Sequence, residues 1–356
     1  MRRPWLAALA ACIAAAIVGC GGSSSPSGGT SSGGGGGSSA EGATIGYSTT
    51  FLADPFQALE QSNSQQQAKE QGLNMLQPTN AGGDIAQQAN DIRNLITQGA
   101  KGLVLSVQDP KGIIPALDFA QQRGVKVVTI GTGVAGGHVV ISVRGDNVGM
   151  GASACEAMGE RLHGRGTVLS LQGALSSVEG RERTAGFRDC MERSFPGIKL
   201  IERPTDWDAK KAADQAQTIM SATPDLAGIY LQSDSTMLQA VSQVMKKAGK
   251  LNKVGEPGHV TLVTIDGTKL AHDDIRAGVV DATVSQPLDK FAQYSVSYLK
   301  DALAGKMPAV GATDHGSRIV EVDGNLQDQL PCPLVTSKNV DDPSLWGNQK
   351  AVVAGG

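Results

Sequence analysis

The chain is poor in aromatic side chains and lacks any concentration of positive charge. Phe, Trp and Tyr make up only 4% of its 356 residues, so an aromatic side chain near the end of a strand is a candidate for function. Asp and Glu number 34 against 31 Lys and Arg, and leaving out Arg2 and Arg3 gives 29 basic residues and a formal charge of −5. Because no basic stripe is visible, we expect no nucleic-acid partner.

The sequence patterns of several enzyme classes are also missing. No zinc-binding spacing occurs among His138, His163, His259, His272 and His315, and no two cysteines form a C-x-x-C pair. Neither a G-x-S-x-G nucleophile elbow nor a phosphate-binding P-loop is present. We therefore expect no enzymatic activity, no metal centre and no cofactor.

One motif does match an enzyme class. Residues 131–136, Gly-Thr-Gly-Val-Ala-Gly, fit the dinucleotide-binding pattern G-x-G-x-x-G and follow a predicted strand. In a dinucleotide site the last glycine opens a helix, whereas here residues 138–143 have an extended pattern. An exported enzyme of Rossmann type is therefore the weakest of the functional alternatives.

The first twenty residues have the pattern of an export signal. Arg2 and Arg3 precede an apolar run over residues 5–18 that is too short and too rich in alanine for a membrane span. Residues 17–20, Ile-Val-Gly-Cys, are similar to a bacterial lipobox, although Val18 stands where Ala or Ser is usual. This similarity predicts lipidation of Cys20, and an ordinary signal peptide with a chance cysteine is the alternative.

A tether follows the export signal. Residues 21–43 consist almost entirely of Gly, Ser and Thr, a composition that cannot form a core. A flexible segment of this length spans on the order of 25 Å. Lipidated Cys20 and this tether together predict an extracytoplasmic domain, anchored by lipid to the cell membrane on its periplasmic or cell-surface side.

Short apolar strands alternate with amphipathic helices in the rest of the chain, which predicts an α/β fold with parallel, doubly wound sheets. The predicted strands cover residues 44–50, 73–77, 102–107, 125–130, 138–143, 167–171, 198–201, 227–231, 260–265, 282–285 and 317–322. The predicted helices cover residues 57–71, 84–98, 113–123, 150–162, 181–193, 209–220, 236–248, 269–277 and 288–304.

Two halves of the pattern repeat each other. Residues 102–106 are echoed by residues 228–232, and residues 128–132 by residues 263–268. Two similar Rossmann-like lobes are therefore expected, with a cleft between them that the carboxyl ends of both sets of strands face.

The predicted division of the chain has five parts. Residues 1–20 form the leader, 21–43 the tether, 44–145 with 287–316 the N-terminal lobe, 146–286 the C-terminal lobe, and 317–356 a hinge-crossing segment and tail. The chain would cross between lobes near residues 145–147, 286–287 and 313–318. Such a multi-strand hinge bends in one mode.

Several short motifs occur in a characteristic order between residues 44 and 322. They are Asp54-Pro55-Phe56, Gly145-Asp146-Asn147, Leu171-Gln172-Gly173 with Arg181-Glu182-Arg183, Asp206-Trp207-Asp208, Ile265-Asp266-Gly267-Thr268 and Gln286. In these motifs the chain resembles the type I periplasmic sugar-binding proteins of the ribose-binding family. The resemblance implies two Rossmann-like lobes, a sugar bound between them, and a substrate-binding lipoprotein that delivers it to an ABC transporter permease. We also expect a monomer.

The resemblance implies ligand contacts at ten positions. They are Phe56, Ser106, Gly131, Thr132, Arg181, Trp207, Ser233, Asp234, Asp266 and Gln286. Phe56 and Trp207 would enclose the C–H face of a sugar. Arg181 would donate to ligand oxygens and Asp266 would accept from hydroxyls, so we expect loss of Arg181 to weaken binding by roughly 2–5 kcal/mol. Arg183 is expected to be a structural or surface charge.

The chain departs from the family pattern at several of these positions. Ribose binders usually carry an Asp-Arg pair where this chain has Gly131-Thr132, Asn where it has Ser106 and Ser233, and a second Phe where it has Gln57. A polar site discriminates strongly through groups left without a partner. The expected ligand is therefore another monosaccharide, a polyol or another small polar molecule.

Two further predictions concern the cysteines and the alternative function. Cys155 and Cys190 fall on consecutive predicted helices that flank the strand at residues 167–171, so a disulfide between them is plausible outside the cytoplasm, with two buried thiols as the alternative. Cys332 would be left over. The main functional alternative is a ligand-sensing receptor that, in its closed state, docks to a membrane sensor kinase or chemoreceptor.

Overall fold

The computed structural model describes residues 40–349. The predicted export signal, Cys20 and most of the tether lie outside this range. Residues 40–43 were expected to end the tether, but they already belong to the fold. Ala40 is buried, and the Gly42 amide donates to the carbonyl oxygen of Gly72 at 2.7 Å, which ties this segment to the end of the first helix.

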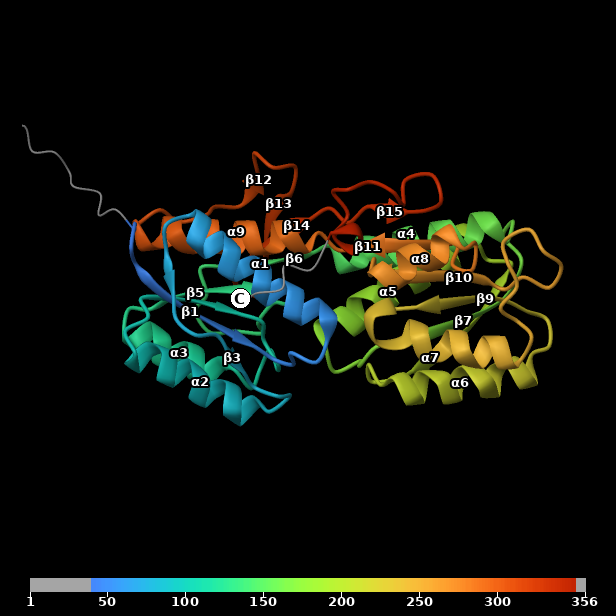
Figure 1. Ribbon diagram of the computed structural model, residues 1–356, viewed down its shortest axis with the longest axis horizontal. Coiled ribbons are helices and arrows are strands. Elements are labelled where there is room, and N and C mark those ends of the chain that lie inside the picture. Colours follow the sequence, from blue (N-terminus) through green and yellow to red (C-terminus); the bar gives the residue numbers. More distant parts are fainter. Residues whose placement is uncertain (1–39, 350–356) are drawn as a thin grey trace, which may run out of the picture. The chain divides into compact units, whose positions relative to one another are not determined.

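Within the described residues the first sheet has nine strands, in the order β12-β13-β14-β6-β5-β4-β1-β2, with β3 beside β1. The strands are β1 (Thr44–Thr49), β2 (Asn74–Met75), β3 (Thr79–Asn80), β4 (Gly102–Leu105), β5 (Lys126–Ile130), β6 (Ile141–Gly145), β12 (Gly311–Ala312), β13 (Arg318–Val322) and β14 (Asn325–Leu330). Figure 1 shows α1 (Pro55–Glu70) and α9 (Leu288–Leu303) on one side of this sheet, and α2 (Ile85–Thr97) and α3 (Ile114–Gln122) on the other.

The second sheet has six strands within the described residues, in the order β15-β11-β10-β9-β7-β8. These strands are β7 (Gly166–Gln172), β8 (Ile198–Pro204), β9 (Leu226–Leu231), β10 (Thr261–Asp266), β11 (Ala282–Ser285) and β15 (Leu334–Val335). One apolar cluster joins the sheet to α4 (Asn147–Arg161) and α5 (Val178–Ser194). Another joins its opposite face to α6 (Ala209–Ala222), α7 (Asp234–Lys247) and α8 (Lys269–Arg276).

The parallel parts of the two sheets have the same topology. In each, the second strand lies at the edge beside the first, and the third, fourth and fifth follow on the other side: β2-β1-β4-β5-β6 and β8-β7-β9-β10-β11. This is one of the two common doubly wound orders, and it places a switch point between the first and third strands of each lobe. The prediction of two doubly wound parallel-sheet lobes is confirmed.

The helix starts follow local sequence signals. Asp54 caps α1 by accepting a hydrogen bond from the Phe56 amide, and Pro55 occupies the first helical turn, where its missing N–H costs nothing. Asp146 caps α4 in the same way by accepting from the Gly149 amide.

A disulfide joins Cys155 on α4 to Cys190 on α5, as predicted. The two Cα atoms lie 6.1 Å apart, and 35 positions separate the cysteines in sequence. Cys332 is a free thiol, and burial raises its pKa to about 12. The bridge therefore fixes the two helices that cover one face of the second sheet.

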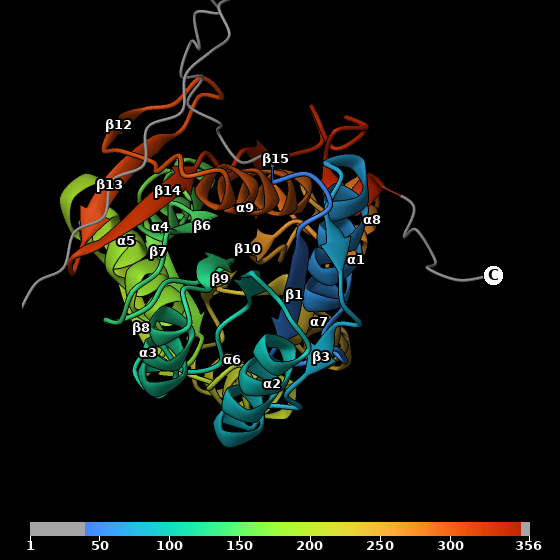
Figure 2. The ribbon, with the colours of Figure 1, turned by 90° about the vertical axis from the view of Figure 1, so that its left-hand side faces the viewer.

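The end of the chain corrects the sequence prediction. The third crossing was expected near residues 313–318, but β12, β13 and β14 all pair within the first sheet, and the chain reaches the second sheet only at β15. Strand β14, which was taken for polar tail, lies beside β6 (Figure 2). The two strands run parallel, with Gln327 opposite Ser142. Its polar side chains are buried and bonded, and this polarity hid the strand.

The tail after β15 packs onto the fold. The short helix η1 (Trp346–Asn348) lies against α8, and the Trp346 indole donates to the carbonyl oxygen of Asp266 at 2.7 Å. The same indole meets the Phe56 ring edge-on, with 6.1 Å between ring centroids. Trp346 therefore touches residues of both lobes.

An ion pair also bridges the lobes near the first crossing. Arg144 on β6 is fully buried and donates to both carboxylate oxygens of Glu182 on α5. It also donates to Gln327 on β14 at 3.2 Å. No helix among residues 40–349 has the length and the apolar character that crossing a membrane requires.

Candidate functional site

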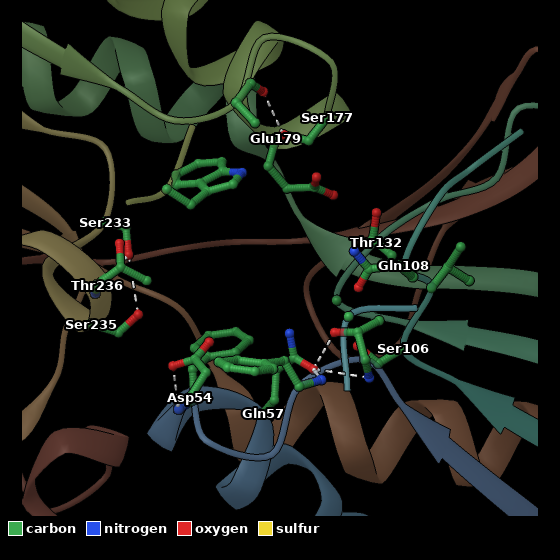
Figure 3. Close-up of a pocket in the computed structure, with 18 of the residues that line it drawn as sticks. Asp54, Gln57, Ser106, Gln108, Thr132, Ser177, Glu179, Ser233, Ser235 and Thr236 are labelled. Atoms are coloured by element: carbon green, nitrogen blue, oxygen red, sulfur yellow. Dashed lines mark hydrogen bonds between the residues drawn. The ribbon is translucent and has the colours of Figure 1, made fainter. Parts of the chain in front are cut away.

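A cavity of about 820 Å³ lies where the strand ends of the two lobes meet. Residues after β1, β4 and β5 line it from the first lobe, and residues after β7, β8, β9, β10 and β11 line it from the second. Figure 3 shows Asp54 and Gln57 on one side, Ser106, Gln108 and Thr132 on another, and Ser177 and Glu179 above them. This is the position at which doubly wound sheets hold ligands.

Eight of the ten predicted residues line this cavity, and two do not. Those that line it are Phe56, Ser106, Gly131, Thr132, Trp207, Ser233, Asp266 and Gln286. Arg181 and Asp234 are absent from the lining, whereas Arg183 is present. The structure therefore places Arg183 at the cavity and Arg181 away from it, whereas the sequence had predicted the reverse.

The start of α5 explains the exchange. The helix begins at Val178 with Ser177 as its cap, three residues before the predicted start. Its buried face contains Gly180, Arg183, Thr184 and Phe187, so Arg181 points outward. The Arg181 guanidinium is exposed and donates to the carbonyl oxygens of the preceding loop, at 3.0 Å and 2.7 Å.

Arg183 holds together four parts of the second lobe. It is 4% exposed, and its Nε donates to Asn147 Oδ1 at 2.8 Å. Its Nη1 donates to the Gln232 carbonyl at 2.5 Å and lies 3.4 Å from Asp266 Oδ1. The guanidinium also lies 5.8 Å from the Trp207 ring centroid. The small and apolar residues between Gly180 and Phe187 have helical spacing, and this pattern could have identified Arg183 as part of the buried face.

Asp234 is a structural residue beneath the cavity. Its carboxylate accepts from the hydroxyls of Thr264 and Thr283 and from the backbone amides of Gly267 and Thr268. These bonds hold the loop after β10 in place. Burial, together with the nearby Asp266 carboxylate, raises the pKa of Asp234.

Asp266 is the hub of the polar groups on the second lobe. Its Oδ1 accepts from Gln286 Nε2 at 2.8 Å, and its Oδ2 accepts from the Ser233 hydroxyl at 2.7 Å. Asp266 has a positive φ of 121°, a backbone conformation that non-glycine residues rarely adopt and that is typical of functional sites. The site therefore presents a carboxylate oriented by several donors.

Trp207 is positioned by an unusual loop. Asp206 and Trp207 have φ values of 57° and 62°, in the left-handed region. The indole lies against Gly173, where any side chain would collide with the ring. Trp207 and Phe56 thus line the cavity from opposite lobes, and their contacts with a ligand stay a prediction.

Several polar residues of the cavity, in or just before α1 and at the start of α5, were not predicted from the sequence. Gln57 Oε1 accepts from the Thr49 hydroxyl and from the amides of Thr50 and Phe51, which fixes the loop after β1. Asp54, Glu60 and Glu179 also line the cavity. The position of Asp54 beside Phe56 was visible in the motif, but Glu60 lies in a stretch without a clear apolar face, where no spacing marks a buried side.

Glu60 is the most unusual of these residues. It is 1% exposed, its Oε1 lacks a hydrogen-bond partner among the described residues, and its Oε2 accepts from the Tyr47 hydroxyl at 3.4 Å. Burial raises the pKa of Glu60 from its ordinary value of 4.5 to about 8, and the charge of Asp54 adds to this effect. Burial likewise raises the pKa of Asp54 to about 6.

The raised pKa of Glu60 makes stability depend on pH. The unfolded chain releases this proton near pH 4.5 and the folded chain only near pH 8, so the stabilisation is complete below 4.5 and is lost as the pH rises to about 8. We expect the free energy of unfolding of Glu60→Gln, relative to that of the wild type, to rise by about 2 kcal/mol between about pH 5 and about pH 7. Urea unfolding at several pH values measures this, with the exposed Glu192→Gln as control, and equal slopes for both variants would contradict it.

Residues 40–349 contain no group of three or more His, Cys, Asp or Glu side chains placed to hold a metal ion. The glycine motif at residues 131–136 is followed by β6 rather than by a helix. The helix N-terminus that a dinucleotide pyrophosphate requires is therefore missing at this point of the described chain.

Comparisons with known proteins agree with this geometry. The family profile described as periplasmic binding protein domain matches residues 45–307. The ribose import binding protein of Bacillus subtilis is 26% identical over 263 residues, which cover 74% of this chain and 82% of that protein. The xylitol-binding protein of Mycolicibacterium smegmatis is 26% identical over 200 residues, or 56% of this chain and 55% of that protein.

A solved structure is similar over most of the chain. It is an ABC transporter solute-binding protein from Mycobacterium smegmatis with bound glycerol. The TM-score is 0.72 and the identity 26%, with 84% of this chain and 96% of that chain covered.

Proposed function

Because the chain belongs to the periplasmic binding protein family, we propose that it is an extracytoplasmic solute-binding protein that captures a monosaccharide or a polyol between its lobes. The observation that carries this is the composition of the cavity, in which two aromatic rings from opposite lobes accompany many hydrogen-bonding groups. A sugar or polyol presents C–H faces to such rings and hydroxyls to such groups. Relatives that bind ribose and xylitol support this ligand class.

The proposed contacts divide between the lobes. Phe56 and Trp207 would enclose the carbon skeleton of the ligand, and the lining groups at Ser106, Thr132 and Gln286 would bond its hydroxyls. Arg183 replaces Arg181 as the proposed cationic contact, because it is the arginine that lines the cavity. Asp266 would accept from a ligand hydroxyl in addition to its protein donors.

We propose that capture proceeds by closure about the three chain crossings. The proposed lobes are residues 40–145 with 287–330, and residues 146–286 with 334–349, which moves β13 and β14 into the first lobe. A ligand that contacts both lobes favours the closed form only to the extent that it binds that form more tightly. A permease of the ABC type would then receive the ligand from the closed form.

A thermal-shift screen tests the proposed ligand class. We expect one or more compounds among pentoses, hexoses, polyols and inositols to raise the melting temperature, because a ligand bound only by the folded state stabilises it. Trp207→Ala should abolish the shift, since the ring forms one wall of the cavity. If no compound shifts the wild type, or if the shift persists in Trp207→Ala, the proposal for this site is wrong.

The lipid anchor and the monomeric state belong to the same proposal. Cys20 lies outside the described residues, and the lipobox-like sequence before it is the support for lipidation. Labelling of growing cells with a fatty-acid analogue should mark the wild type and leave Cys20→Ser unmarked. Equal labelling of the two would contradict the anchor, and light scattering of the chain without residues 1–20 checks the monomer.

A further inference from the structure

The cavity contains far more acidic than basic side chains. Among the described residues, one basic side chain, that of Arg183, lines it. The acidic residues that line it are Asp54, Glu60, Asp109, Glu179, Asp206 and Asp266. Like charges in a shared site repel one another. A positively charged or donor-rich ligand would therefore stabilise this excess of carboxylates.

Three of these carboxylates already have partners. Asp266 lies beside Arg183, and Asp206 pairs with Lys211 at 2.5 Å. Asp109 accepts from the backbone amides of Lys111 and Gly112, at 2.8 Å and 2.9 Å. The carboxyl groups of Asp54, Glu60 and Glu179 have no cationic partner among residues 40–349.

Two of the remaining carboxyls have an oxygen that is buried and unbonded. Glu60 Oε1 and Glu179 Oε1 are both shielded from solvent, and neither has a hydrogen-bond partner in the described part of the chain. They come from opposite lobes, Glu60 from α1 and Glu179 from the first turn of α5. An unbonded buried oxygen is costly, so each marks a place where a ligand donor would be stabilising.

Glu60 is held at the wall of the cavity by its neighbours. A Cβ atom at Gly131 would lie 2.7 Å from Glu60 Oε1, so the missing side chain at position 131 leaves room for this oxygen. The charge of Asp54 raises the pKa of Glu60, and the charge of Asp266 raises the pKa of Asp54. The other titratable group against Glu60 is the Tyr47 hydroxyl, which donates to its second oxygen.

The protonation of this pair fits a missing positive charge. Burial is the main cause of the pKa of about 8 for Glu60 and of about 6 for Asp54, and a nearby carboxylate raises each further, that of Asp54 for Glu60 and that of Asp266 for Asp54. A cation between the two groups would offset both effects. The loop after β5 contributes Gly131 and Thr132 to the lining, so it supplies no cation.

We propose, on the basis of the proposed function above, that the cavity selects a polyhydroxylated ligand with a protonated amine, such as an amino sugar or an amino polyol. The ammonium group contacts the carboxyls of Asp54 and Glu60, and the hydroxyls contact the polar groups of the second lobe. Sugar acids and sugar phosphates are excluded by the same carboxyls.

Titration calorimetry with matched pairs tests this specificity. The pairs are D-glucosamine with D-glucose, D-galactosamine with D-galactose, and the 1-amino-1-deoxy derivative of sorbitol with sorbitol, and D-glucuronate serves as the anion. In pairs that bind, we expect the amine to bind about 10-fold more tightly or better than its neutral partner, the size of one charge-assisted contact, and the anion not to bind. Equal or tighter binding of the neutral partner overturns the amine preference and leaves the proposed function standing. Absence of binding by every compound overturns both.

Two amide variants locate the ammonium. Glu60→Gln keeps the size of the side chain, and we expect it to remove most of the preference for the amine over its neutral partner. Glu179→Gln changes the other unbonded carboxyl, on the opposite lobe, and we expect it to reduce the preference much less than Glu60→Gln does. A preference that survives Glu60→Gln, or that is lost in Glu179→Gln instead, overturns the assignment to the first lobe. Thermal unfolding confirms that each variant is folded.

Discussion

Replacing Arg183 by methionine is expected to lower the free energy of unfolding by roughly 3–5 kcal/mol, although methionine keeps much of the length of the side chain. The substitution leaves Asp266 without its cation and leaves the oxygens of Asn147 and Gln232 without their donor. Both the unpaired charge and the unsatisfied oxygens are buried, so their cost is high. Chemical denaturation of the folded variant measures the loss.

The same variant is expected to bind its ligand more weakly by roughly 2–5 kcal/mol, because a buried charged contact is lost. The double variant Arg183→Met with Asp266→Asn should regain part of the stability, since it no longer buries an unpaired carboxylate.

Arg181→Met is the natural control for Arg183. It lies on the same helix, carries the same charge, and bonds only to the carbonyl oxygens of the preceding loop in the described structure. We expect it to lower stability by about 1 kcal/mol or less and to leave binding unchanged. Equal effects of the two substitutions, on binding or on stability, would show that the assignment of the cationic contact to Arg183 is wrong.

Removing the disulfide is expected to cost about 4 kcal/mol of stability in the double variant Cys155→Ala with Cys190→Ala. The bridge closes a loop of 35 positions, and on the chain-entropy account the reduced unfolded chain gains the freedom that this loop restricts. Denaturation of the two proteins under identical conditions gives the difference.

A matched variant separates the bridge from the loss of a buried sulfur atom. Cys332→Ala removes a free, half-buried thiol and is expected to cost about 1 kcal/mol, the size of a small cavity. Reductant should lower the stability of the wild type and leave that of the double variant unchanged. If reductant lowers the stability of the wild type and of the double variant equally, the disulfide does not contribute the expected stability.

The strand ends of both lobes were predictable because several weak signals agreed there. Apolar runs such as residues 102–105 end at small or polar residues, and in a parallel sheet all these ends meet on one edge. The resemblance to the ribose-binding family implied Phe56, Trp207, Asp266 and Gln286 as ligand contacts, and all four line the cavity at these strand ends. Their proposed contacts with a ligand remain predictions.

The exchange of Arg181 and Arg183 shows where that logic stops. A difference of three residues in the helix start turns a side chain to the other face, and the cap at Ser177 was not recognised. The pattern of small and apolar residues on α5 contained the answer, because Gly180, Thr184 and Phe187 share a face with Arg183. The periodicity of buried residues along a helix is thus a better guide to which side chains face a site than the position of the first residue of a motif.

Strand β14 was missed for the opposite reason, since its sequence is mostly polar and only Leu326 and Leu330 are apolar. Its buried side chains include Gln327, which accepts from Arg144, and Asp328, which accepts from Tyr298, His315 and Ser317. A polar strand of this kind is stable only when every group finds a partner. Those partners come from distant parts of the chain, so no local pattern could reveal them.

The position of Trp346 has a further, optical consequence. Of the three tryptophans in the sequence, Trp5 lies in the predicted leader, Trp207 lines the cavity, and Trp346 bonds to the backbone of Asp266 and touches Phe56. Both tryptophans within residues 40–349 are therefore close to the ligand cavity, Trp207 in its lining and Trp346 in contact with two lining residues. The intrinsic fluorescence of the protein is a built-in reporter of events in the cavity, and it needs no attached dye.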